Sequence, residues 1–218
     1  MTNKGKQVLS FFHGTAVGWL GQDGFSYQKI PFGEANPPHR FLYICSLFEG
    51  AKSSALNSKT WCDRRIENDA SFAGHFTRNP NGVPAAAVYT IDIGNLKSID
   101  WAAPRLERKK ADMLFPALQK IHWRKGQKLE YFARRAVMFL TRNRGWQDWV
   151  TFAGASYLSG PGYDRRLITG DDRRSIIFKL AGFQVIRNFE RTPDGKYGEV
   201  AALIYGDKPY MPTRCVLV

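Results

Sequence analysis

Short apolar runs at both ends of the chain constrain its fold most. Residues 7–14 (QVLSFFHG) and 40–48 (RFLYICSLF) are rich in aromatic and aliphatic residues and border Gly or Pro clusters, which is typical of buried strands. Residues 84–100 (PAAAVYTIDIGNLKSID) predict a third strand that leads to a Gly-Asn turn. Residues 175–189 and 198–218 return to β-branched runs broken by Gly and Pro, so we expect strands to close the chain.

The centre of the chain has the period of helices instead. Residues 47–70 carry small and polar residues at helical spacing, which predicts a short helix. Residues 111–123 and 128–143 place apolar side chains three and four positions apart, with Arg and Lys between them. Residues 144–175 have the Gly, Pro and paired charges of a connector, within which 146–158 suit a further helix or strand.

Strands at both ends with helices between them indicate the α+β class. We expect a single domain over residues 1–218, with a basic helical insertion at about 104–150. The formal net charge is +13, and residues 105–144 hold twelve Lys or Arg against three acids, a local balance of +9. Such a charge predicts an anionic partner, either nucleic acid or an acidic protein surface.

The cysteines and the hydropathy pattern favour a reducing compartment. Cys45, Cys62 and Cys215 are odd in number and far apart, so neither a disulfide framework nor a zinc site is suggested. No apolar run has the length of a membrane helix, and the N-terminal apolar segment is too short for a secretion signal. We therefore expect a cytoplasmic protein without a membrane partner.

Three short motifs follow one another along the expected strands. His13-Gly14-Thr15 ends the first strand, Tyr43 lies in the second strand before the small-residue stretch that holds Ser54, and Glu199 opens the last strand, GEVAALIY. Taken singly, these motifs are also typical of a turn, a core aromatic and a solvated strand end. Their order resembles the ADP-ribosyltransferase superfamily, in its diphtheria-toxin and poly(ADP-ribose) polymerase branch with a His-Tyr-Glu signature.

This resemblance implies a split β-sheet core and NAD as co-substrate. The family transfers ADP-ribose by breaking the bond between nicotinamide and ribose, through a transition state with oxocarbenium character. A carboxylate beside the ribose stabilises the positive charge that develops there. The resemblance implies that Glu199 is this catalytic carboxylate.

The resemblance also implies a set of NAD-binding residues. Gly14 has no side chain, so its backbone N–H and C=O can approach the nicotinamide carboxamide. His13 or Thr15 contacts ribose hydroxyls, and the ring of Tyr43 stacks on nicotinamide. Ser54, on the helix after the Tyr strand, completes the set.

The chain departs from the family pattern at several places. Asn57 stands where the polymerase branch usually carries a second aromatic residue, so the nicotinamide is gripped from one side or by another ring such as Phe48. Tyr197 stands two residues before Glu199, where the arginine-specific branch has Gln or Glu, and arginine modification is therefore disfavoured. Residues 101–175 have no counterpart in the family.

Part of this unmatched segment combines basic and aromatic residues in a way that favours nucleic-acid binding. Lys and Arg neutralise phosphates, and Trp123, Tyr131 or Trp146 could stack on bases, although aromatics of an amphipathic helix usually face the core. The candidates for contact with an anionic partner are Arg124, Lys125, Arg134, Arg135, Arg142 and Arg144.

Two functions from different classes remain open. The first is an NAD-dependent ADP-ribosyltransferase, a toxin or effector that acts on nucleic acid or protein. The alternative is a non-enzymatic inhibitor encoded by a plasmid or phage, directed against conjugation or host defence, which binds its partner through the basic face of a degenerate scaffold of the same kind. His39, His75 and His122 have no metal-ligand spacing, so no metal is expected in either case.

Overall fold

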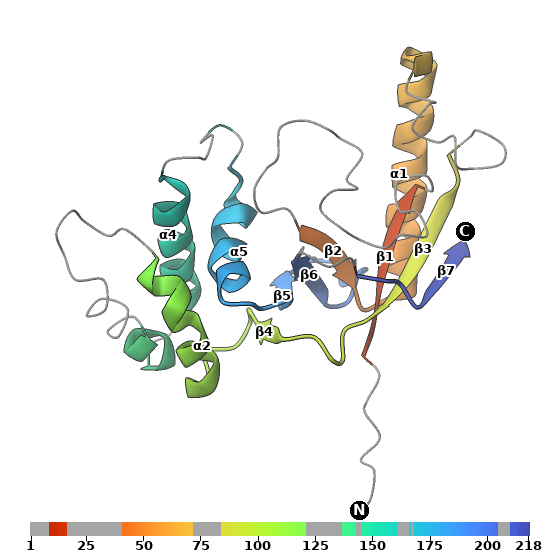
Figure 1. The fold of residues 1–218 in the computed structure, drawn as a ribbon. Coiled ribbons are helices and arrows are strands. Elements are labelled where there is room, and N and C mark those ends of the chain that lie inside the picture. Colours follow the sequence, from red (N-terminus) through yellow and green to blue (C-terminus); the bar gives the residue numbers. More distant parts are fainter. Residues whose placement is uncertain are drawn as a thin grey trace, which may run out of the picture.

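The described strands form one mixed sheet. The computed structural model describes residues 9–16, 41–71, 84–120, 137–142, 145–160, 166, 168–204 and 210–218. The strands are β1 (Ser10–Ala16), β2 (Phe41–Cys45), β3 (Ala86–Asp92), β4 (Ser98–Asp100), β5 (Val185–Glu190), β6 (Val200–Ile204) and β7 (Arg214–Leu217). Their order across the sheet is β4-β5-β6-β2-β1-β3-β7, and neighbours are antiparallel except β4 and β5 (Figure 1). The predicted α+β class is thereby confirmed.

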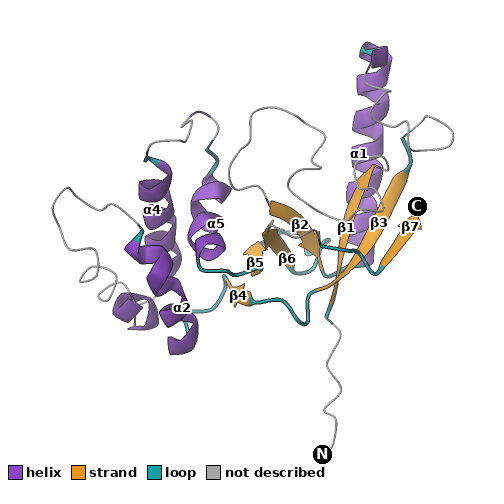
Figure 2. Cartoon of the chain, in the orientation of Figure 1, coloured by secondary structure: helices purple, strands orange, loops and turns teal. Residues whose placement is uncertain are grey.

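The labelled helices lie in two groups along one face of this sheet (Figure 2). They are α1 (Phe48–Asn68), α2 (Arg108–Gln119), α4 (Trp146–Leu158) and α5 (Gly170–Leu180). Alternate residues of a strand point to opposite faces, and β6 shows both environments. Ala202 and Ile204 pack in the core of α2, α4 and α5, and Val200 packs in the core of α1. Ala201 and Leu203 belong to the core on the opposite face.

A face of small residues brings α1 close to β1 and β3. Ala51 and Ala55 are fully buried there, and the hydroxyl of Ser58 accepts a hydrogen bond of 3.2 Å from the backbone N–H of Ala16. Small side chains allow a helix to approach a strand closely, which fixes the position of α1 relative to the end of β1.

The predicted strands in the first hundred residues and the predicted helix at 47–70 are confirmed with small changes of boundary. Residues 146–158 form the helix α4, inside a segment that the sequence indicated mainly as a connector. Of the predicted helix at 128–143, the described residues 137–142 are helical.

The predicted strand at 175–189 is wrong over its first part, because residues 175–180 belong to α5. This helix begins with a capping box, in which the hydroxyl of Thr169 accepts from the backbone N–H of Asp172 and the carboxylate of Asp172 accepts from the backbone N–H of Thr169. It ends before Gly182, whose φ of 77° lies in the left-handed region. These two signals outweigh the β-branched residues between them.

The sheet is narrowly joined where β1 meets β2. These two strands share one register pair, Phe12 with Cys45, whereas β1 and β3 pair along seven positions. In a regular antiparallel ladder Gly14 would stand opposite Tyr43, but the two strands have separated at that point. The separation exposes the backbone and side chains of both strands to one space.

Candidate functional site

A cavity of about 230 Å³ lies where β1 and β2 separate. Both strands line it, through Phe12, His13, Gly14, Tyr43, Ile44 and Cys45. The remaining lining residues come from α1 and from the segment around the ends of β5 and β6: Ala51, Ser54, Glu190, Thr192, Tyr197 and Val200. Sites for drug-sized ligands span roughly 300–1,000 Å³, so this cavity suits one ring with a polar substituent.

The structure brings four of the predicted site residues to this cavity. His13, Gly14, Tyr43 and Ser54 all line it, although they are separated by up to about forty residues in the sequence. Thr15 is buried in β1 opposite Ala87 and is not a lining residue. Motifs that are far apart in the sequence therefore meet at one cavity.

His13 bridges the gap between the two strands. Its Nδ1 lies 2.7 Å from the backbone carbonyl oxygen of Tyr43, and because a carbonyl only accepts, Nδ1 carries the proton and donates. Burial lowers the pKa of His13 from 6.5 to about 4, against the opposing effect of this hydrogen bond. The imidazole is uncharged at neutral pH, which makes its Nε2 an acceptor.

Gly14 is required by the packing of α1. A Cβ atom at this position would lie 1.7 Å from the carbonyl oxygen of Ala51 and 2.8 Å from the backbone N of Ala55. The absence of a side chain at Gly14, which we predicted for ligand contact, is therefore also required by the packing of α1. Both uses are compatible, since Gly14 lines the cavity as well.

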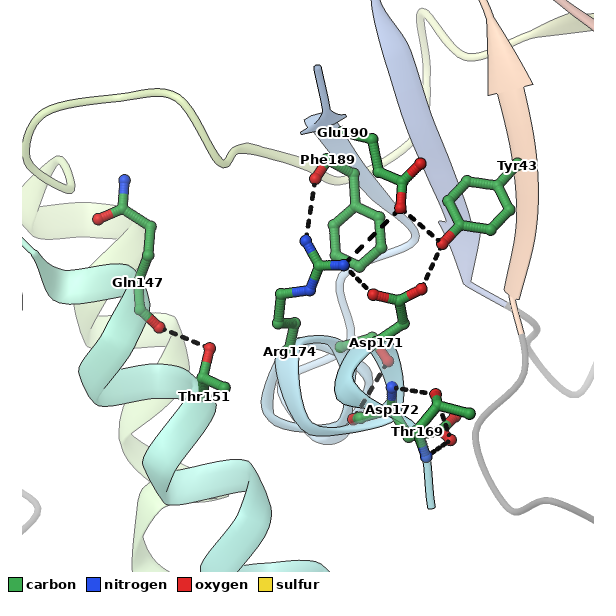
Figure 3. A network of polar contacts seen from close by, with 10 residues as sticks. Tyr43, Gln147, Thr151, Thr169, Asp171, Asp172, Arg174, Phe189 and Glu190 are labelled. Carbon is green, nitrogen blue, oxygen red and sulfur yellow. Dashed lines mark hydrogen bonds and ion pairs between the residues drawn. The ribbon is translucent and has the colours of Figure 1, made fainter. Parts of the chain in front are cut away.

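The Tyr43 hydroxyl lies within hydrogen-bond distance of two carboxylates and has one proton to donate. The hydroxyl donates to Oδ2 of Asp171 and lies 3.1 Å from Oε1 of Glu190 (Figure 3). Burial and the neighbouring Glu190 charge raise the pKa of Tyr43 above its usual value. The phenol therefore stays protonated, and its ring is fixed beside the cavity with an edge-to-face contact to Phe41 at 5.1 Å.

Arg174 connects the same two carboxylates. It donates to Oδ1 of Asp171, lies 3.8 Å from Oε1 of Glu190 and stacks over the ring of Phe189 at 4.4 Å (Figure 3). Ionised Asp171 and Glu190 with one guanidinium give this cluster a formal charge of −1. The N-terminal turn of α5 thereby orders the wall of the cavity formed by β2 and β5.

Glu199 is engaged elsewhere. Its two carboxylate oxygens accept from Nε and one terminal nitrogen of Arg187, at 2.8 and 2.6 Å, and Oε1 also accepts from the backbone N–H of Asn188. Glu199 is not a lining residue of the cavity. This fork-to-fork pair joins β5 to the start of β6.

Of the residues predicted to bind an anionic partner, Arg142 is exposed at the end of the helical residues 137–142. The others, Arg124, Lys125, Arg134, Arg135 and Arg144, lie outside the described residues. Trp146, one of the aromatics considered for stacking on bases, is fully buried and donates from its indole N–H to the carbonyl of Ala103 at 2.7 Å. Its role is in the core.

The acidic residues that contact Tyr43, Asp171 and Glu190, were not among the predicted site residues. Asp171 and Arg174 belong to the DDRRS stretch, which indicated a charge cluster or a helix start. Glu190 had no signal at all, because nothing local in the sequence relates it to Tyr43. Phe48, the aromatic residue proposed as a second ring against nicotinamide, is not a lining residue of the cavity and packs edge-to-face on Phe12 at 5.6 Å. The aromatic residues that line the cavity beside Tyr43 are Phe12 and Tyr197.

A second cavity, of about 380 Å³, lies beside α4 and the end of β5. Its lining includes Trp101, Gln147, Asp148 and Arg191, and none of the predicted site residues that the structure describes. The cavity between β1 and β2 is thus the one that the motifs share.

No family model matches the chain, and no curated protein or solved structure matches it either. Among the described residues, no helix has both the length and the apolar character needed to cross a membrane. Within the same part of the chain, no three His, Cys, Asp or Glu side chains are grouped so that they could hold a metal ion.

Proposed function

We propose that this protein is an NAD-dependent ADP-ribosyltransferase with a macromolecular acceptor, nucleic acid or protein. One observation carries the proposal: His13, Gly14, Tyr43 and Ser54, chosen for their resemblance to the family's NAD-binding residues, line one cavity. The strands β1 and β2, which carry His13 and Tyr43, and β6, which begins directly after Glu199, are also neighbours, in the order β6-β2-β1.

The chemistry of the cavity supports this proposal. Phe12, Tyr43 and Tyr197 supply aromatic surface, and the separated strands supply backbone groups, so a planar ring with a carboxamide matches both. His13 lines the cavity as an uncharged imidazole, so a ribose hydroxyl can lie beside it without the cost of a buried charge. The cavity has room for the nicotinamide end of NAD and not for the whole dinucleotide, whose remainder would extend outside it.

The direct test is calorimetric titration of NAD into the full chain. Ser54→Leu places a larger side chain in the cavity, and Ser53→Leu makes the same change on the neighbouring residue of α1, which does not line it. We expect wild type and Ser53→Leu to bind NAD, and Ser54→Leu to bind at least about tenfold more weakly, a loss of about 1.4 kcal/mol. Absence of binding by wild type at millimolar NAD would reject the proposal.

One observation favours the alternative, a non-enzymatic inhibitor. Both oxygens of the Glu199 carboxylate accept hydrogen bonds from Arg187, which is typical of a structural ion pair. If the protein is an inhibitor, its partner binding will depend on the basic residues and will be indifferent to His13 and Glu199. Assaying one set of variants for both NAD and partner binding separates the two functions.

A further inference from the structure

The proposed transfer needs a carboxylate beside the cavity, and the structure offers one that the sequence motifs did not indicate. Glu190 lines the cavity, and its side chain is 42% exposed. Glu199 has a 17% exposed side chain, does not line the cavity and is paired through both oxygens with Arg187. The two glutamates thus have opposite environments.

An irregularity in β5 places Glu190 opposite Val200, which lines the cavity. Ile186 pairs with Ala202 and Glu190 pairs with Val200. Between these two pairs β5 advances by four residues and β6 by two. In a regular ladder Asn188 would stand opposite Val200. Asn188 instead adopts a φ of 50°, in the left-handed region, and the Glu199–Arg187 pair braces the bulge because Glu199 also accepts from the Asn188 N–H.

The wall beside Glu190 also holds an unsatisfied polar atom. Among the described residues, the hydroxyl of Thr192 is a buried side-chain group that has no hydrogen-bond partner. Thr192 lines the same cavity. Buried polar groups are nearly always satisfied, so an orphaned hydroxyl in a cavity wall is consistent with a polar ligand group beside it.

Building on the proposed function, we propose that Glu190 is the catalytic carboxylate of the transfer, and that Asp171 and Arg174 act as positioning residues through Tyr43. The Arg174 guanidinium lies 3.8 Å from one oxygen of Glu190 and the Tyr43 hydroxyl lies 3.1 Å from the same oxygen, and Asp171 accepts hydrogen bonds from both of these groups. The net negative cluster stabilises positive charge that develops on a bound ribose.

The reaction balances with these groups alone. The C–N bond between ribose C1′ and nicotinamide breaks, and its electron pair leaves with the nicotinamide nitrogen, which turns a pyridinium cation into neutral nicotinamide. A bond forms between C1′ and the nucleophilic atom of the acceptor, whose proton passes to Glu190 and then to solvent. With water as acceptor, the products are ADP-ribose, nicotinamide and a proton.

Nicotinamide release from NAD by the full chain tests this assignment. We expect Glu190→Gln to fold, to bind NAD and to release nicotinamide at least about 100-fold more slowly than wild type. Glu67→Gln makes the same change on the exposed end of α1, outside the cavity, and should release at the wild-type rate. Glu199→Gln should lower the melting temperature through loss of the Arg187 pair and slow release by less than about tenfold.

Asp171→Asn tests the positioning role. We expect a lower kcat with an unchanged KM and a shifted acid limb of the pH–rate profile, because the substitution changes the charge that faces Tyr43 and Glu190 without entering the cavity. If kcat and the pH–rate profile of Asp171→Asn equal those of wild type, the positioning role of Asp171 is overturned.

The two failures are distinguishable. If Glu199→Gln abolishes release while Glu190→Gln is as fast as wild type, the assignment to Glu190 is overturned and the proposed function stands. If wild type neither binds NAD nor releases nicotinamide, both are overturned.

Discussion

His13 shows how one side chain can serve the fold and the site together. Where β1 and β2 separate, its Nδ1–H supplies the Tyr43 carbonyl with a hydrogen bond of 2.7 Å, in place of one from the opposite strand. This bond sets the tautomer, and burial keeps the ring uncharged, with its pKa lowered to about 4. A strand that ends in His-Gly-Thr therefore has a structural purpose even before a ligand is considered.

The lowered pKa of His13 predicts an acid-dependent loss of stability. The unfolded chain takes up a proton on this residue near pH 6.5, whereas the folded chain does so near 4, so the free energy of unfolding falls as the pH drops through that window. Above pH 6.5 the contribution is fully present. His13→Asn keeps a donor for Tyr43 and has no titrating group.

Thermal unfolding across this pH window provides the measurement. Between pH 6.5 and 4, the melting temperature of wild type should fall further than that of His13→Asn. Above pH 6.5, the melting temperatures of the two proteins should depend on pH to the same extent. Parallel curves throughout the window would show that His13 does not titrate as its environment requires.

Glu190 and Glu199 mark the limit of sequence analysis at the scale of residues. Both follow or precede an apolar strand, and GEVAALIY resembled a family motif whereas the surroundings of Glu190 resembled none. What separates them is the pairing of Glu199 with Arg187, twelve residues away, and of Glu190 with Tyr43, 147 residues away. Contacts of this kind have no local signature.

At the scale of elements, the contact between β1 and α1 decides the shape of the cavity. The helix crosses the end of the strand so closely that the Gly14 position has no room for a Cβ. The small residues of α1 were visible in the sequence, but their match to Gly14 was not, because it depends on how the helix crosses the strand.

Gly14→Ala should therefore destabilise the fold by about 3 kcal/mol or more, since the contacted atoms belong to the backbone of α1 and cannot rotate away. Gly170→Ala is the matched control: an added Cβ there meets nothing within 4 Å, and in the first turn of α5 the change should be neutral or stabilising. Chemical denaturation measures both. Equal effects of the two substitutions would contradict the close packing of α1 on β1.

The start of α5 explains why its strand prediction failed. Ile176, Ile177 and Phe178 favour a strand by composition, yet all three are fully buried on a helix that opens with the Thr169–Asp172 capping box. Burial on several sides allows a helix to carry a continuous apolar run. The first turn of α5 also brings Asp171 and Arg174 close to Tyr43. Because the sequence indicated only a charge cluster or a helix start there, these two residues were not recognised as part of the candidate site.

At the scale of the whole molecule, composition predicted the class of fold but not the arrangement of its strands. Aromatic and β-branched runs located most strands, whereas the order β4-β5-β6-β2-β1-β3-β7 brings together segments from both ends of the chain. No local pattern in the sequence indicates that the motif-bearing strands are neighbours in the sheet. The ADP-ribosyltransferase fold itself stays a proposal.

The net charge of +13 predicts salt-dependent binding to an anionic polymer. Reversing the charges of Arg134 and Arg135, within the basic segment 105–144, should weaken binding to duplex DNA or RNA by at least about tenfold. The same reversal at Arg64 and Arg65 on α1, outside that segment, should have a smaller effect. Fluorescence anisotropy at two salt concentrations compares them, and equal losses would show that the basic segment has no special role.

A crystal structure determined after soaking with NAD will show whether the cavity between β1 and β2 holds the nicotinamide end of NAD. We expect electron density for the nicotinamide ring among Phe12, Tyr43, Ser54 and Tyr197, with Glu190 beside the adjoining ribose. Density for NAD at another place on the molecule, or an empty cavity at saturating NAD, would contradict this expectation.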